Sequence, residues 1–215
     1  MNVVDTVMQA YPYLFHPAVV LGLGAVLTIH WEWSRQSAPA SDLWRRVAVF
    51  LAAGALSLLP SAVYMVVTGS GPMETMQGNG AQVDALVAGG IGVVAGTTWY
   101  LWRRFDWGAA VPRLMETYAI VAVPYVALSP VWNVSGHVLL SLTPALFLTL
   151  LDRRYWPTLA VPVVMVPNRI YVDAHTWPQA IGAFLLGTVL VVGVYRLRVD
   201  GDDSLPDASG ASRTH

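Results

Sequence analysis

The chain has 215 residues, of which 55% are hydrophobic and only 12% are charged, and its formal net charge is −1. Soluble domains carry about 25% charged residues, so this composition argues against a soluble protein and favours a polytopic membrane protein with a single domain. The near-zero charge offers no basic patch for nucleic acid, and the lack of cysteine excludes disulfides, a thiol nucleophile and cysteine-based zinc sites.

All 12 basic residues are arginines, because the sequence contains no lysine. A retinal protein needs a lysine amine to form its Schiff base. The apolar segments described next therefore do not indicate a retinal-binding bundle.

Residues 1–16 have mixed polarity and lack the basic segment of a secretory signal, so we expect an interfacial lead-in to a first span. Seven apolar segments follow, several of them close to the roughly 20 residues that cross a bilayer. These segments cover residues 17–33, 47–68, 83–102, 117–132, 136–151, 155–172 and 177–197. The predicted fold is an all-α, polytopic transmembrane helix bundle of about six or seven spans, forming one domain over residues 1–198. The acidic stretch 199–215 predicts a disordered cytoplasmic tail.

The arginines predict the orientation in the membrane. Eleven of the twelve fall in alternate loops, or after the last span, and would therefore share one face. The positive-inside rule makes that face cytoplasmic, with the N-terminus outside and the C-terminus inside the cell membrane. Arg169 is the exception, because it falls on the outer face near His137 and His175. A lone cation beside two imidazoles in a membrane protein indicates a functional site on that face.

The residues of this site suit phosphate chemistry. Ser135-Gly136-His137 begins an apolar segment, with Ser135 as a good N-cap, and a helix N-terminus binds phosphate readily. Arg169 adds a forked donor that matches phosphate oxygens. One histidine could attack phosphorus while the other protonates the leaving oxygen, and no metal is required. A metal site of three histidines, adding His16, is a weaker alternative without sharp ligand spacing.

These residues resemble two motifs of the type 2 phosphatidic acid phosphatase (PAP2) superfamily. Ser135-Gly136-His137 is similar to the second motif, and Asn168-Arg169, His175 and Gln179 follow the spacing of the third, Ser-Arg-x5-His-x3-Asp. The likeness covers about residues 132–187, which implies a PAP2-like core at about 117–197. The first motif, Lys-x6-Arg-Pro, has no counterpart, and Gln179 stands where the family has an aspartate.

The resemblance implies that His175 is the nucleophile, forming a phosphohistidine, and that His137 protonates the leaving group. Arg169, Ser135, Gly136 and Asn168 would bind the phosphate, and Gln179 would accept the imidazole proton. The expected protein is an integral membrane hydrolase without a cofactor. Its substrate would be a membrane lipid of phosphatidate or polyprenyl (di)phosphate type, because the site lies at the bilayer surface.

Two alternatives remain open. The incomplete motifs are also consistent with a catalytically inactive PAP2-fold protein that binds lipid headgroups or acts as a membrane scaffold. A transporter is a weaker option, because the spans lack the buried charges of ion-coupled pathways. Glu74 and Asp84 flank a glycine-rich outer segment, which we interpret as a solvated loop rather than a lid.

Overall fold

A computed structural model describes residues 2–76 and 80–198, so the predicted tail at 199–215 lies outside the described residues. The described residues form helices and no strand, which confirms the all-α prediction. A 3-10 helix, η1, covers Arg153–Leu159. The α-helices are α1 (Val3–Leu14), α2 (Pro17–Trp33), α3 (Ala40–Leu56), α4 (Leu59–Thr68), α5 (Pro72–Met76), α6 (Gly80–Phe105), α7 (Ala110–Trp132), α8 (Gly136–Leu151), α9 (Ala160–Tyr171) and α10 (Trp177–Arg198).

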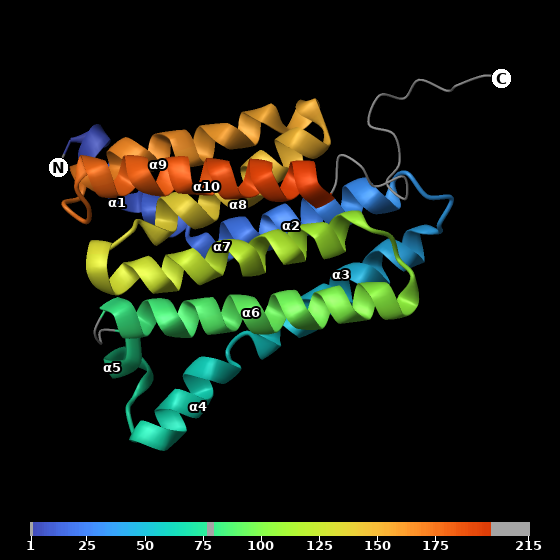
Figure 1. Ribbon diagram of the computed structural model, residues 1–215, viewed down its shortest axis with the longest axis horizontal. Helices are drawn as coiled ribbons and strands as arrows, with labels where there is room; N and C mark the ends of the chain where they lie inside the picture. Colours follow the sequence, from blue (N-terminus) through green and yellow to red (C-terminus); the bar gives the residue numbers. More distant parts are fainter. Residues whose placement is uncertain (1, 77–79, 199–215) are drawn as a thin grey trace.

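The long helices run side by side along one axis, with α4 splayed away from the others (Figure 1). The centre of the bundle is α8, which contacts α2, α7, α9 and α10. Its apolar side chains are mostly buried, as expected of a helix that is hydrophobic all round. The N-terminus of this enclosed helix carries Ser135-Gly136-His137, so the core itself positions the motif.

The described residues hold fewer candidate spans than the six or seven expected. Ala40–Thr68, α6, α7 and α10 are long and apolar enough to cross a membrane. The bent pair of α1 and α2 makes a fifth if it is one broken span. The central α8 is apolar but has only 16 residues, and α9 has 12 because η1 takes up the start of the segment 155–172.

Arginine is segregated at one end of the bundle. The α2–α3, α6–α7 and α8–η1 connections and the end of α10 lie together at this end (Figure 1). They, or the helical turns beside them, carry every arginine of the described residues except Arg169. The opposite end holds the start of α8, the end of α9 and the start of α10. Which end faces the cytoplasm stays a prediction.

A buried carboxylate joins three helices at the arginine-rich end. Glu32 of α2 is 1% exposed and accepts hydrogen bonds from Trp102 Nε1 at 3.0 Å and from the Ala110 amide at 2.5 Å. The same carboxylate therefore binds a side chain of α6 and an otherwise unpaired amide at the start of α7. Glu32 belongs to the scaffold, at the end of the bundle away from His137.

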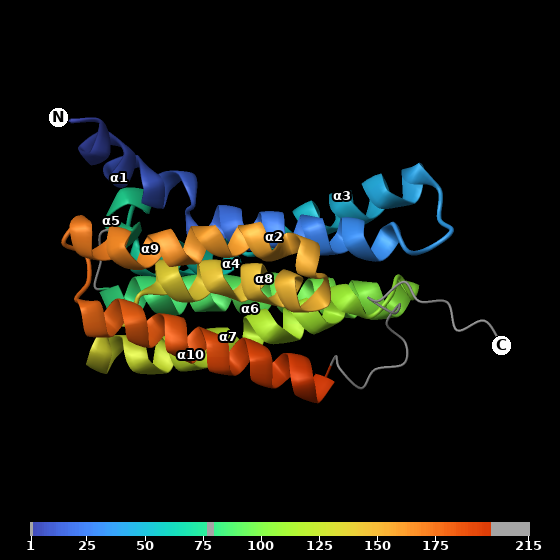
Figure 2. The ribbon, with the colours of Figure 1, turned by 90° about the horizontal axis from the view of Figure 1, so that it is seen from above.

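The predicted lead-in is a helix that packs on α9. α1 is bent by 60° from α2, and Figure 2 shows it projecting at the end of the bundle. Tyr11 donates a hydrogen bond to the Val161 carbonyl at 3.0 Å, and Asn168 Nδ2 donates to the Met8 carbonyl at 2.6 Å. These bonds fix the bend, and the bend brings His16 to the site.

Candidate active site

Three helix ends bring the predicted site residues together. His137 lies in the first turn of α8, Arg169 in the last turn of α9, and His175 in the loop before α10. The charge of Arg169 and the imidazole of His175 both act electrostatically on His137. The ring of His16 also contacts that of His137 edge-on, with centroids 5.7 Å apart. The structure therefore brings together the two histidines and the arginine of the motifs, and adds a third histidine.

The backbone after α9 fixes His175 relative to Arg169. The amides of Ala174 and His175 both donate to the Arg169 carbonyl, at 3.0 and 3.2 Å. Asp173 takes a left-handed conformation with φ of 54°, which asparagine and aspartate tolerate better than most residues. This tight turn around one carbonyl holds the imidazole close to the guanidinium-bearing residue.

The start of α8 keeps polar groups available. Ser135 is the N-cap residue, as predicted, yet its side chain makes no capping hydrogen bond, and its buried Oγ has no partner. The Leu139 amide is the donor to the Ser135 carbonyl, so the amides before it lack a carbonyl four residues back within the helix. These donors and the helix dipole together favour an anion at this position.

Unpaired buried polar atoms collect around the same point. Among the described residues, such atoms include Ser135 Oγ, Arg169 Nε, His175 Nδ1 and Asn168 Oδ1. A buried polar group without a partner costs about 1–3 kcal/mol, so these atoms are candidates for contact with a ligand. A hydroxyl, a guanidinium and an imidazole all donate, which fits a ligand with several anionic oxygens.

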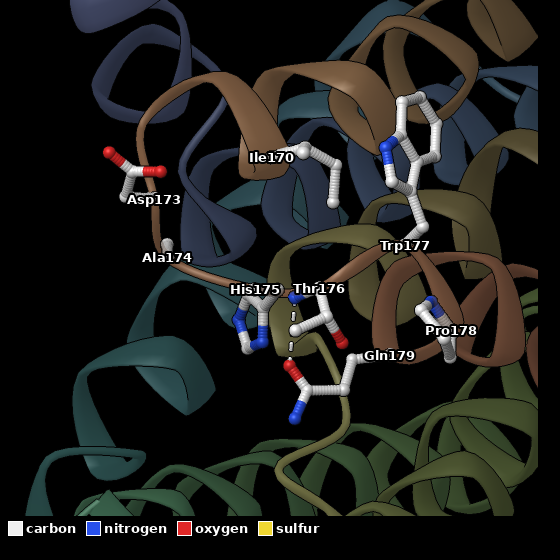
Figure 3. Close-up of a pocket in the computed structure, with 8 residues that line it drawn as sticks. All are labelled: Ile170, Asp173, Ala174, His175, Thr176, Trp177, Pro178 and Gln179. Atoms are coloured by element: carbon white, nitrogen blue, oxygen red, sulfur yellow. Dashed lines mark hydrogen bonds between the residues drawn. The ribbon is translucent and has the colours of Figure 1, made fainter.

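Two predicted residues have further partners. Asn168 is fully buried, and its Nδ2 donates to the Met8 carbonyl, so its amide joins α9 to α1 while its Oδ1 has no partner; its predicted role in phosphate binding stays a prediction. Gln179 Oε1 accepts a hydrogen bond from the Thr176 amide at 2.9 Å, which caps the start of α10 (Figure 3). The Gln179 side chain also lies close enough to His175 to raise the pKa of its imidazole.

An open hollow of about 530 Å³ lies beside the site. Figure 3 shows the His175 and Gln179 side chains next to each other, while the Asp173 carboxylate points away from them. Eight residues line the hollow: Ile170, Asp173, Ala174, His175, Thr176, Trp177, Pro178 and Gln179. It is large enough to admit a phosphate headgroup to His175.

The surroundings of His175 favour its neutral form. Burial lowers the pKa of its imidazole, and the Arg169 charge lowers it further. The backbone of Asn133, the side chain of Gln179 and the charge of Asp84 oppose this shift without cancelling it. A neutral imidazole at neutral pH is the form that can act as a nucleophile.

Two residues near the site were not assigned to it from the sequence. His16 was considered only as a metal ligand, and no cluster of three or more potential ligands occurs in the described part of the chain, so that alternative has no support. Asp84 was expected to flank a solvated loop and was given no part in the site, but it lies near the start of α6 and accepts hydrogen bonds from Tyr125 and Ser129 of α7. A carboxylate at the start of the apolar segment 83–102 was the available signal.

Comparison with known protein families supports the motif assignment. A family model described as the PAP2 superfamily matches residues 128–202. No curated protein and no solved structure matches the chain. The matched range includes the N-terminus of α8, Arg169 and the His175 loop, while the first half of the chain lies outside it. Residues 128–202 are therefore a PAP2 superfamily domain.

Proposed function

We propose that the protein is an integral membrane phosphatase that hydrolyses a phosphorylated lipid through a phosphohistidine. One observation carries the proposal: His137, Arg169 and His175 converge at a helix N-terminus inside a PAP2 superfamily domain. The unpaired donors on Ser135, Arg169 and His175 support an anionic ligand at this point.

The reaction divides into two transfers. In the first, neutral His175 attacks phosphorus, the bond to the lipid oxygen breaks, and His137 gives that oxygen a proton. In the second, His137 takes a proton from water, the water oxygen attacks phosphorus, and the bond to His175 breaks. Phosphate leaves, and both histidines return to their starting states.

Charge on the phosphoryl oxygens is balanced by the rest of the site. Arg169 and the amides at the start of α8 face the place where negative charge develops, with the Ser135 hydroxyl as a further donor. Loss of one such donor typically costs about 10²–10³ in turnover. The site thus achieves phosphoryl transfer by positioning and electrostatics, as this chemistry requires.

The position of the site supports a lipid substrate. The hollow opens at the ends of α9 and α10, where Tyr171 and Trp177 are exposed, as aromatic residues are at membrane interfaces. A phosphatidate-type or polyprenyl (di)phosphate lipid would keep its chains in the bilayer while its phosphate reaches His175. Since the arginine-rich end is opposite, we infer from the positive-inside rule that the site lies on the outer face of the cell membrane.

Phosphate release from purified protein tests this function. In detergent, without added metal, the protein should release phosphate from phosphatidate or from a polyprenyl diphosphate. His175→Ala should abolish the release. His30→Ala is a matched control, because this histidine is exposed near the arginine-rich end. Equal activity in His175→Ala and the unmodified protein would contradict the mechanism.

A second candidate, a non-catalytic binder of phosphorylated lipid headgroups, is favoured by Gln179. A neutral amide that already accepts a hydrogen bond from the Thr176 amide stabilises an imidazolium less well than a carboxylate does. This candidate predicts lipid binding that Arg169→Ala weakens, with no turnover. Gln179→Asp separates the two functions, since an enzyme should become faster and a binder should stay inert.

A further inference from the structure

His175 lacks a carboxylate partner on its own loop and on α10. Gln179 is an amide that also caps α10, and Asp173 points away from the imidazole (Figure 3). A phosphoryl-accepting histidine gains positive charge during the transfer, and a nearby anion stabilises that charge and orients the ring. A carboxylate from another element would satisfy this need.

Asp84 of α6 is such a carboxylate. Its charge acts on His175 and favours the protonated imidazole. The other formal charge that acts on His175 is the positive charge of Arg169 on α9. Among the described residues, Asp84 is the negative charge that acts on His175, and His137 is a further titratable group that interacts with it.

The position of Asp84 is fixed by α7. The Tyr125 hydroxyl and the Ser129 hydroxyl both donate to its carboxylate, and both of these residues are buried. Ser129 also accepts, through its backbone carbonyl, a hydrogen bond from the Asn133 amide at 3.1 Å. The backbone of Asn133 in turn raises the pKa of the His175 imidazole, so hydrogen bonds link Asp84 through Ser129 to a segment that lies beside the histidine.

The same network reaches the start of α8. A Cβ atom built on Gly136 would lie 2.6 Å from the Tyr125 hydroxyl oxygen, so Tyr125 packs directly against the Ser135-Gly136-His137 motif. The tyrosine therefore lies between the carboxylate and the proposed phosphate site. The Asp84 carboxylate is therefore bonded to a tyrosine that packs against the second motif.

We propose that Asp84 is a positioning residue for His175, supplying from α6 the negative charge that the third motif lacks at Gln179. The inference rests on the proposed function for its kinetic consequence, but the electrostatic effect of Asp84 on His175 can be measured without turnover. In this proposal Asp84 orients His175, although position 179 holds an amide and not a carboxylate.

Kinetics test the positioning role first. Asp84→Asn keeps the shape and removes the charge, so kcat should fall roughly 10- to 100-fold, as for other residues that orient a catalytic group. Gln179→Asp should restore kcat at least tenfold in the Asp84→Asn background and raise it less in the unmodified protein. A purely structural role for Asp84 would give no such rescue. The control Glu74→Gln, an exposed carboxylate on α5, should leave kcat unchanged.

If Asp84→Asn does not fold, Ser129→Ala provides a milder version of the same test. This variant removes one of the two hydroxyls that hold the Asp84 carboxylate. Gln179→Asp should then raise kcat by a larger factor in the Ser129→Ala background than in the unmodified protein. An unchanged gain in this background, together with normal kcat, would overturn the proposal.

Histidine titration separates this inference from the proposed function. In protein labelled with ¹³C-histidine, the His175 signal, assigned by its loss in His175→Gln, should titrate at lower pH in Asp84→Asn than in the unmodified protein. Glu74→Gln should not move it. If the shift occurs but the protein shows no turnover, the phosphatase proposal is rejected and the electrostatic interaction between Asp84 and His175 stands. Identical titration in Asp84→Asn and the unmodified protein would reject that interaction.

Discussion

His16 and His137 lie edge to face, with ring centroids 5.7 Å apart. The Nδ1 atom of His16 accepts a hydrogen bond from the Ala18 amide at 3.3 Å, so a neutral His16 carries its proton on Nε2. The junction of α1 and α2 therefore supplies a proton-bearing ring beside the proposed general acid.

The leaving group tests the role of His137. His137→Ala should reduce phosphate release from a lipid alcohol by about 10²–10⁴, the usual contribution of a general acid. The loss should be much smaller with p-nitrophenyl phosphate, whose leaving group needs no proton. Equal losses with both substrates would show that His137 acts in binding instead.

The pH profile reports the state of His175. Since burial and Arg169 lower the pKa of this imidazole, the acidic limb of kcat/KM should lie below the ordinary histidine value of about 6.5. Arg169→Gln should move that limb to higher pH. The unfolded protein binds this proton more readily than the folded one, so stability should decrease as pH falls below about 6.5. An acidic limb above that value would contradict the described environment.

Gly136 should not tolerate a side chain. In Gly136→Ala the new Cβ would meet the Tyr125 hydroxyl at 2.6 Å, so the tyrosine, and the Asp84 carboxylate bonded to it, must shift. We expect turnover to fall roughly tenfold or more, the scale seen when groups that orient a site are disturbed. Gly22→Ala is the matched control, because nothing lies within 4 Å of its Cβ position. Equal turnover in Gly136→Ala and Gly22→Ala would show that the position of Tyr125 does not affect the reaction.

Glu32 should affect stability without affecting the site. Glu32→Ala leaves Trp102 Nε1 and the Ala110 amide without their acceptor, at roughly 1–3 kcal/mol for each unpaired donor. The unfolding temperature in detergent should fall clearly. Below that temperature the phosphate release per folded molecule should stay normal, because His175 lies at the other end of the bundle (Figure 1).

The lack of cysteine makes the orientation easy to measure. Single substitutions Ser70→Cys, between α4 and α5, and Ser37→Cys, between α2 and α3, lie at opposite ends of the bundle. In intact cells an impermeant thiol reagent should label the first and not the second. The reverse pattern would place the site on the cytoplasmic face.

The sequence predicts the local part of this site and misses the part made by packing. His137, Arg169 and His175 are found because each motif is a short pattern, and the helices between them return the chain to one end. Asp84 is missed because its neighbours Tyr125 and Ser129 lie some 40 residues away, and only the packing of α6 on α7 brings them together.

The count of spans shows a similar limit. Hydropathy identifies the segments 136–151 and 155–172. It does not show that the segment 136–151 is enclosed by other helices, or that the segment 155–172 begins with a 3-10 helix. Helix lengths and neighbours decide which segments can cross a bilayer. His16 likewise reaches the site only because α1 and α2 meet at a bend.

The most direct measurement is a rapid quench with lipid that carries a labelled phosphate. The account predicts a transient phosphoprotein, labile in acid and stable in base, with the label on His175 and none in His175→Ala. The His137→Ala variant should still form the intermediate when the leaving group needs no proton. Phosphate release without a labelled protein, or with the label on another residue, would contradict the account.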